Sequence, residues 1–320
     1  MSILVTGAAG FIGSNLCHYL TSLRHKVVGL DNFSVGSNWN NLNGLDSFYF
    51  SLEVGDISQM SPQKFQYVLM RHDVQAVIHL AAATHVDRSI SFDEEFYRTN
   101  VIGTSNLLRA CMDRGKRIRI FVNQCSDEVY GSIAKPFEAY EDDVFNPTSP
   151  YAASKAAQYY VGMSYWKTYR FPVVSTFPSN TFGPRQWPEK LIPRAALRVL
   201  RDEPIPLMKS SENRRDWLYI QDHCEALYLI MNRGGYGESY NFGGGSSLTN
   251  KEVVDTILAW NGKGSIETIP DRPGHDTRYA VNSDKIKSLG WSPSKSVHLH
   301  LLDTLDWYRA NMKQYERVWA

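Results

Sequence analysis

Three adjacent polar residues near the middle of the chain carry groups that could do acid–base chemistry. Ser126, Asp127 and Glu128 follow a mostly apolar, β-branched run at residues 118–122, which predicts a buried strand. Ligands of open α/β sheets bind at the carboxyl ends of the strands. The sequence therefore predicts a hydroxyl and two carboxylates at a binding edge.

A phenol and an ammonium group follow on a predicted helix. Ser149 and Pro150 mark the start of that helix, and Tyr151 and Lys155 lie four residues apart on one of its faces. Taken alone, a Tyr-x-x-x-Lys spacing arises by chance in many helices, and a solvated turn before an ordinary helix would explain it. The amino-terminal sequence favours the chemical interpretation instead.

A glycine-rich loop lies between a predicted strand and a predicted helix at the amino terminus. Residues 3–5 are apolar, and the loop Gly7, Gly10, Gly13 has the spacing G-x-x-G-x-x-G. Such glycines allow a tight turn and let the backbone approach a pyrophosphate at the helix amino terminus. Phe11 and Ile12 begin the apolar side of that helix and would lie beside the same phosphates.

Asp31 ends the next apolar run, 24 residues after Gly7. A carboxylate near this position binds the adenosine ribose in dinucleotide-binding folds. No arginine follows Asp31 directly, so the 2′-phosphate of NADP would meet a negative charge. This order of strand, glycine loop, helix, second strand and Asp31 predicts an NAD site.

Further cofactor contacts are predicted where later strands end. The turn at residues 55–57 offers a place for an adenine, and small side chains after the run at 76–80 would let a dinucleotide cross the sheet edge. The candidates at these and neighbouring positions are Asn32, Asp56, Ile57, Leu80, Ala81, Ala82 and Asn100.

Alternating strand and helix patterns predict an α/β fold, a Rossmann-type doubly wound parallel sheet with a smaller mixed carboxyl-terminal domain. We expect an NAD-binding domain at residues 1–176, to which segments near 217–243 return. Residues 177–320 are rich in proline and glycine and would form the smaller second domain.

Bulk properties exclude several classes of protein. The formal net charge of +1 gives no overall attraction to nucleic acid or to an anionic membrane, and no apolar run is long enough to span a bilayer. The four cysteines have no metal-binding spacing and indicate reduced thiols. Cys125, beside the polar triplet, could be reactive, but a packed role is favoured. Because the first predicted strand leaves no room for a signal peptide, we expect a cytoplasmic protein.

The motifs together resemble those of extended short-chain dehydrogenases/reductases, and most closely the nucleotide-sugar 4,6-dehydratases of the dTDP-glucose type. The resemblance runs nearly end to end. The glycine loop and the Tyr/Lys pair mark only the superfamily. The dehydratases are indicated by the Asp127-Glu128 doublet and by the runs at residues 188–193 and 272–276.

The resemblance implies a role for each catalytic candidate. Tyr151 would take the 4-hydroxyl proton while a hydride passes from C4 of the sugar to NAD, with Lys155 lowering the pKa of the phenol. Ser126 would hydrogen-bond the 4-oxygen. Glu128 would remove the C5 proton, and Asp127 would protonate the departing 6-hydroxyl. The hydride then returns to C6.

The resemblance also implies that residues 177–320 are a sugar-nucleotide-binding domain, and it implies individual substrate contacts and an assembly. The residues that match substrate-binding positions are His85, Ser126, Asn180, Lys190, Leu191, Arg215, Arg272 and His275. The family commonly dimerises through a four-helix bundle, and the matching helices here lie near 100–113 and 151–168. No metal is implied.

Departures from the family pattern leave the substrate open. The segment 207–213 replaces an aromatic residue and a glycine-containing turn beside the base pocket, which weakens the assignment to thymine. UDP-glucose or UDP-N-acetylglucosamine therefore remain alternative substrates. A nucleotide-sugar epimerase or decarboxylase is a further alternative, but it has no 6-hydroxyl to expel and no need of Asp127. A non-enzymatic NAD sensor or RNA-binding factor is disfavoured by the intact set of catalytic residues.

Overall fold

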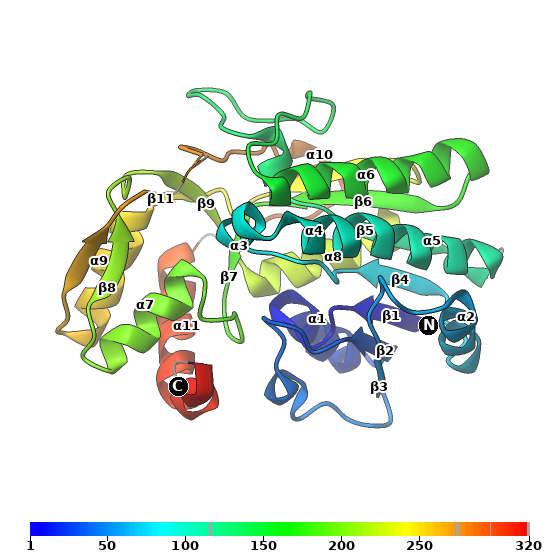
Figure 1. Ribbon diagram of the computed structural model, residues 1–320, viewed down its shortest axis with the longest axis horizontal. Coiled ribbons are helices and arrows are strands. Elements are labelled where there is room, and N and C mark those ends of the chain that lie inside the picture. The colour runs from blue at the N-terminus through cyan, green and yellow to red at the C-terminus, as the bar shows by residue number, and fades with distance from the viewer. Residues whose placement is uncertain (115–116, 272, 274–275, 295, 319–320) are drawn as a thin grey trace.

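A seven-stranded parallel sheet forms the centre of the molecule in the computed structural model (Figure 1). The structure describes residues 1–114, 117–271, 273, 276–294 and 296–318. The strand order is β10-β6-β5-β4-β1-β2-β3, which confirms the predicted doubly wound sheet. The strands are β1 (Ser2–Thr6), β2 (Lys26–Asp31), β3 (Phe50–Val54), β4 (Ala76–His79), β5 (Ile120–Gln124), β6 (Val173–Pro178) and β10 (Ser239–Phe242).

Helices cover both faces of this sheet because the buried strands are apolar on both sides. In β1, Ile3 and Val5 pack in one core cluster while Leu4 packs in the other. The first cluster lies under α1 (Phe11–Ser22) and α8 (Ile220–Arg233). The second lies under α2 (Pro62–Arg71) and α5 (Thr104–Asp113), beside which α6 (Pro150–Tyr169) packs.

The connection from β4 to α5 is a series of short helical turns. These are α3 (Val86–Ser91), α4 (Asp93–Tyr97) and the π-helical segment η2 (Arg98–Gly103). The single-turn helices η1 (Trp39–Leu42) and η4 (Asp127–Tyr130) follow β2 and β5. The predicted helix near 100–113 is therefore present, but its first turn is a π-helix.

The remaining elements gather at one side of the sheet around a third core cluster (Figure 1). They comprise a three-stranded sheet, a two-stranded sheet and the helices that pack on them. Their bounds are β7 (Asn180–Phe182), α7 (Leu191–Leu200), β8 (Ile205–Met208), β9 (Arg214–Tyr219), β11 (Ser247–Thr249), α9 (Asn250–Asn261), β12 (Ile266–Ile269), α11 (Val297–Asn311) and η5 (Met312–Val318).

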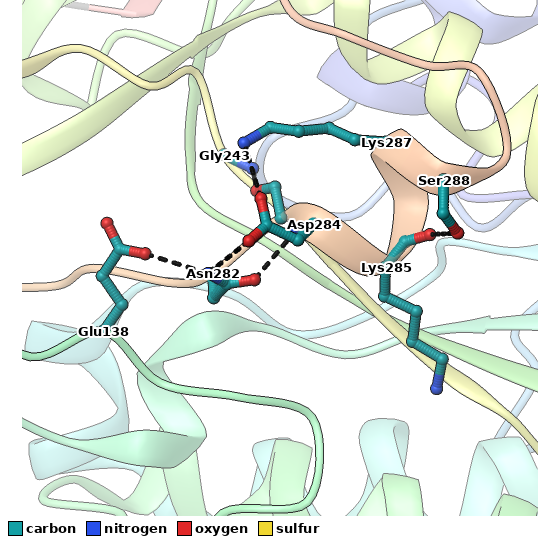
Figure 2. Close-up of polar contacts among 8 residues, drawn as sticks. Glu138, Gly243, Asn282, Asp284, Lys285, Lys287 and Ser288 are labelled. Carbon is teal, nitrogen blue, oxygen red and sulfur yellow. Dashed lines mark hydrogen bonds and ion pairs between the residues drawn. The ribbon is translucent and has the colours of Figure 1, made fainter.

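The chain crosses back to the large sheet more than once. α8 packs against α1, and β10 pairs with β6 at the sheet edge. Later, α10 (Asp284–Ser288) contacts β10, and its first turn is held by Asn282, which also bonds Glu138 at 3.3 Å (Figure 2). The segment after β5 and the segment before α10 therefore lie together beside the sheet.

Candidate active site

A cavity of about 1030 Å³ runs from the glycine loop to the start of α7. It is lined by Gly7, Gly10, Phe11, Ile12, Gly13, Asp31, Asn32, Asp56, Ile57, Leu80, Ala81 and Ala82 at one end, and by Ser126, Asp127, Glu128, Tyr151, Lys155, Asn180 and Lys190 at the other. The structure thus brings the five catalytic candidates together with every predicted cofactor-binding residue except Asn100. The volume of the cavity is at the upper end of the range for small-molecule sites.

The glycine loop is built for close backbone contacts. Gly7 has φ +69°, and a Cβ there would lie 2.9 Å from the backbone nitrogen of Ala81. A Cβ on Gly13 would lie 2.0 Å from the Gly7 carbonyl oxygen. Gly10 is the N-cap of α1 and has no side chain, so the helix amino terminus stays open to an anion.

Asp31 lies at the end of β2 and organises the loop around it. Its Oδ2 accepts a bond from the backbone of Ala9 at 2.9 Å, while Oδ1 accepts from Phe33 at 2.8 Å and from the Ser37 hydroxyl at 2.9 Å. These bonds hold the carboxylate in the cavity wall next to the glycine loop. Its negative charge suits a ribose hydroxyl and opposes a 2′-phosphate.

The polar triplet lies in η4, just past the end of β5. Ser126 is the N-cap, and its hydroxyl accepts from the backbone of Glu128 at 3.3 Å and donates to Asp127 Oδ1 at 3.4 Å. Asp127 Oδ2 is buried without a hydrogen-bond partner in the described part of the chain. A buried carboxyl oxygen that lines a cavity and lacks a partner is suited to act on a ligand.

Burial and a neighbouring charge shift the pKa of one member of the Asp127–Glu128 pair. Burial raises the pKa of Asp127 well above its usual range, and the neighbouring charge of Glu128 raises it further. This shift favours the protonated form of Asp127, the form that can act as an acid, and it separates Asp127 from the neighbouring carboxyl group of Glu128.

Tyr151 and Lys155 lie in the first turns of α6, where Ser149 caps the helix and Pro150 begins it. Burial raises the pKa of Tyr151 well above its usual range, and the charge of Glu128 adds to this. Burial lowers the pKa of Lys155 to about 8. Without a further positive charge nearby, the phenol would stay protonated.

A buried amide network holds Lys155. Its ammonium donates to the Gln124 carbonyl at 2.7 Å and to Gln158 Oε1 at 2.6 Å. Gln158 in turn donates to Asn123 Oδ1 at 2.8 Å, and the Gln124 side chain bonds His223 at 2.8 Å. Two of the three ammonium protons are thus committed, and the group is held at the cavity wall. The sequence analysis missed Gln158, although it lies one turn after Lys155 on the same helix.

We expect Gln158→Leu to lower kcat by roughly 10-fold to 100-fold, since a hydrogen bond to a charged group contributes about 1.5–3 kcal/mol. The leucine also removes an acceptor from the ammonium form, so the pKa of Lys155 should fall. Kinetics across a pH series would measure both effects. Gln158→Glu keeps an acceptor oxygen but adds a negative charge beside the ammonium, so it should raise the pKa of Lys155 and shift the pH profile in the opposite direction. Equal pH profiles for wild type and Gln158→Leu would contradict this role.

Several predicted residues lie outside the described cavity lining. Asn100 is fully buried beneath it and bonds both backbone groups of Ala83. His85 caps α3 by accepting from the backbone of Arg88 at 3.3 Å. Leu191 begins α7, next to the cavity residue Lys190. Their binding roles stay predictions.

Of the predicted basic substrate-binding residues in the later part of the chain, the structure describes Arg215 but not Arg272 or His275. Arg215 is buried in β9, where its guanidinium donates to the carbonyls of Arg214 and Asp276 at 2.9 Å. It does not line the cavity as described, and a phosphate contact there stays a prediction. Arg272 and His275 lie outside the described residues.

The described residues include no group of His, Cys, Asp or Glu that could hold a metal ion. Among the helices in the described ranges, none combines the length and apolar character of a membrane span. Cys125 is buried, and burial raises the pKa of its thiol to about 12, which favours the packed role over a reactive one.

Comparison with known proteins decides the family. The family model described as GDP-mannose 4,6 dehydratase matches residues 4–303. The chain belongs to this nucleotide-sugar dehydratase family. Among curated members, the dTDP-glucose 4,6-dehydratase of Xanthomonas campestris is 38% identical, over 98% of this chain and 95% of its own length. The enzyme of that name from Neisseria gonorrhoeae is 39% identical, over 97% of this chain and 96% of its own length.

Solved structures of related dehydratases share the whole fold. The dTDP-glucose 4,6-dehydratase DesIV from Streptomyces venezuelae, crystallised with NAD bound, has a TM-score of 0.93 and 37% identity, covering 99% of both chains. A UDP-glucose 4-epimerase from Thermus thermophilus, in complex with NAD, has a TM-score of 0.89 and 29% identity, covering 97% of this chain and 99% of its own. Fold alone therefore does not separate dehydratases from epimerases, and the side chains of the site must do so.

Proposed function

We propose that the protein is an NAD-dependent nucleotide-sugar 4,6-dehydratase that converts dTDP-glucose to dTDP-4-keto-6-deoxyglucose. The observation that carries this proposal is the carboxyl pair at the cavity wall, with Asp127 buried and its Oδ2 unpartnered in the described structure beside Glu128. An epimerase expels no hydroxyl and needs no such acid. The full-length similarity to enzymes named dTDP-glucose 4,6-dehydratase supports the proposal.

The residues at the glycine-loop end of the cavity fit NAD. Gly7, Gly10 and Gly13 would admit the pyrophosphate, and Asp31 would bind the adenosine ribose. The small Ala81 and Ala82 would lie along the dinucleotide where it crosses the sheet edge. Bound NAD would supply a hydride acceptor for C4 of the sugar and return that hydride to C6.

The residues at the other end of the cavity each carry out a different proton transfer or hydrogen bond. Tyr151 takes the proton of the sugar 4-hydroxyl, and the Lys155 ammonium stabilises the phenolate, to which bound NAD would add a further positive charge. Ser126 hydrogen-bonds the 4-oxygen. The new 4-ketone acidifies the C5 proton, which Glu128 removes, and Asp127 protonates the departing 6-hydroxyl.

Substrate would lie where the two parts of the molecule meet. The proposed NAD-binding unit is residues 1–176 with the returning segment 217–243, and residues 177–320 otherwise form the sugar-nucleotide unit. Asn180 supports this, because its Oδ1 is buried without a partner in the described structure and the residue lines the cavity. Lys190 would meet the diphosphate from the start of α7.

The proposal includes a homodimer formed by the outer faces of η2, α5 and α6. Ile102 of η2 is 53% exposed and Tyr160 of α6 is 60% exposed, so large apolar side chains remain on the outer surfaces of these two elements in the described chain. Packing two helices from each subunit would bury them. The four free, buried cysteines suit a reducing cytoplasm, which is the location we propose.

The cofactor prediction can be tested without turnover. We expect denatured protein to release NAD rather than NADP, because Asp31 would oppose a 2′-phosphate and a cofactor restored in each turnover has no reason to leave. Chromatography of the extract against both standards would identify the nucleotide. Recovery of mainly NADP would contradict the role given to Asp31.

The substrate prediction is tested by comparing dTDP-glucose, UDP-glucose and UDP-N-acetylglucosamine under one condition. We expect a 4-keto-6-deoxy product and the highest kcat/KM for dTDP-glucose, with a preference below roughly a hundredfold. The reason is segment 207–213, where Met208 ends β8 and the following turn bonds Asp271 through Ser210. A methionine can cover a pyrimidine but lacks the ring geometry of an aromatic stack.

The outcomes separate the alternatives. An isomer of unchanged mass would indicate an epimerase, and no reaction with any of the three would indicate a binding protein. A strong preference for a uridine sugar would change the identity of the substrate but would leave the catalytic residues as assigned.

A further inference from the structure

A buried tyrosine lies beside Glu128, outside the described lining of the cavity. The Tyr279 hydroxyl lies 3.4 Å from Glu128 Oε2 and 2.8 Å from Asp276 Oδ2. Tyr279 is 4% exposed, and it is not among the described residues that line the cavity. The phenol therefore connects Glu128 to a second carboxylate outside the substrate site.

Three hydroxyl groups lie within hydrogen-bond distance of the Asp276 carboxyl group. Its Oδ1 lies 2.7 Å from the Ser132 hydroxyl, and its Oδ2 lies 2.6 Å from the Thr148 hydroxyl and 2.8 Å from that of Tyr279. A phenol has one proton to donate, and the shorter distance directs it to Asp276. The Tyr279 oxygen then faces Glu128 with a lone pair, ready to accept a proton rather than to give one.

The far end of this chain of groups reaches solvent. Ser132 and Thr148 are exposed, whereas Asp276 and Tyr279 are buried. Burial raises the pKa of Tyr279 well above its usual range, so the phenol keeps a proton except during a transfer. Four groups thus lie in order from the cavity to the surface: Glu128, Tyr279, Asp276 and the Thr148 or Ser132 hydroxyl.

We propose that Tyr279 and Asp276 relay protons between Glu128 and bulk solvent while the sugar fills the cavity. This rests on the proposed role of Glu128 as the base that removes the C5 proton. Protonated Glu128 gives its proton to the Tyr279 oxygen as Tyr279 gives its own to Asp276. Asp276 then passes a proton to the Thr148 oxygen as Thr148 gives one to water, and the reverse sequence delivers a solvent proton to Glu128.

The relay determines which hydrogen isotope is found at C5 of the product, and this is separate from the overall rate. Glu128 removes a proton from C5 and returns one to C5 after C6 is reduced, so turnover balances without exchange. With the relay, the abstracted proton is replaced by one from solvent before the return. Tyr279 and Asp276 are therefore positioning and relay groups that decide which hydrogen isotope is found at C5 of the product.

The test is turnover of dTDP-glucose in D₂O, followed by NMR of the product. Wild type should place deuterium at C5. Tyr279→Phe should raise the fraction of product that retains protium at C5 by roughly tenfold, the change expected from one lost hydrogen bond. Tyr240→Phe is the matched control: Tyr240 is also 4% exposed, but its hydroxyl accepts from the Gly235 backbone, and its product should match the wild-type label.

The double variant Ser132→Ala with Thr148→Val tests the exposed end without touching the buried tyrosine. It should also raise protium retention, and it keeps the test decisive if Tyr279→Phe does not fold. Full deuteration of C5 by either variant would overturn the relay. Failure of the proposed function is a different result, because wild type would then form no 4-keto-6-deoxy product at all.

Discussion

Tyr151→Phe should lower kcat about 10²–10⁴-fold, the range that a positioned general base contributes. Phenylalanine keeps the ring that packs edge-on against Phe96, with centroids 6.2 Å apart, but it cannot accept the 4-hydroxyl proton. Oxidation at C4 is the first chemical step, so the variant should form no reduced cofactor on mixing with substrate. Stopped-flow absorbance of NADH and a product assay would measure both effects.

Substrate affinity provides the control for this variant. Calorimetry should give a Kd close to that of wild type, since the site keeps its shape. Tyr67→Phe, at a 58% exposed tyrosine on α2, should leave kcat unchanged. A Tyr151→Phe enzyme that retains more than about a tenth of wild-type kcat would require another base.

Asp127→Asn should abolish water loss while sparing oxidation at C4. The amide has nearly the shape of the carboxyl group but no acidic proton for the departing 6-hydroxyl. We expect kcat to fall about 10²–10⁴-fold, with NADH building up in the first turnover and decaying slowly. Asp142→Asn, at an exposed acid after β5, is the matched control and should behave as wild type. Lost activity without a reduced-cofactor signal, while substrate still binds, would contradict the role of Asp127.

The same variant should change stability in a pH-dependent way. Burial raises the folded-state pKa of Asp127 above its unfolded value, so the stability that the protonated carboxyl contributes is lost as pH rises through the folded pKa. An asparagine cannot ionise. The Tm of Asp127→Asn relative to wild type should therefore be higher at about pH 8 than at about pH 5. A Tm difference that does not change with pH would mean that Asp127 is not held protonated.

Local patterns predicted the parts of the fold that depend on neighbouring residues. The glycine loop, Asp31 and the start of α6 all rest on short-range chemistry, and the structure places them as expected. β5 was predicted at residues 118–122 but spans Ile120–Gln124. Asn123 and Gln124 are polar, yet they are buried because Gln158 and His223 satisfy their amides. A hydrophobic pattern cannot anticipate partners that lie so far along the chain.

β3 is displaced in the same direction, for a different reason. The aromatic residues at positions 48–50 favour a strand there by propensity, whereas β3 spans Phe50–Val54. Phe48 is 66% exposed, and the strand lies at the sheet edge with a single neighbour, so burial constrains it weakly. Propensity alone therefore misplaced its start.

In the site, the residues that act on substrate were predictable and those that support them were not. Ser126, Asp127, Glu128, Tyr151 and Lys155 lie in short motifs. Tyr279 approaches Glu128 from a segment 151 residues further along the chain, and no local signal marks it. Similarly, only tertiary structure shows that the Arg215 guanidinium is held by backbone carbonyls.

In the proposed reaction, one hydride leaves C4 and returns to C6 of the same sugar while water is lost between C5 and C6. dTDP-glucose carrying deuterium at C4 tests this directly, with the product analysed by NMR and mass spectrometry in ordinary water. We predict a 4-keto-6-deoxy product with deuterium in its 6-methyl group and none released to solvent. Deuterium that remains at C4 of an unchanged or epimerised sugar would contradict 4,6-dehydration as the function of this site.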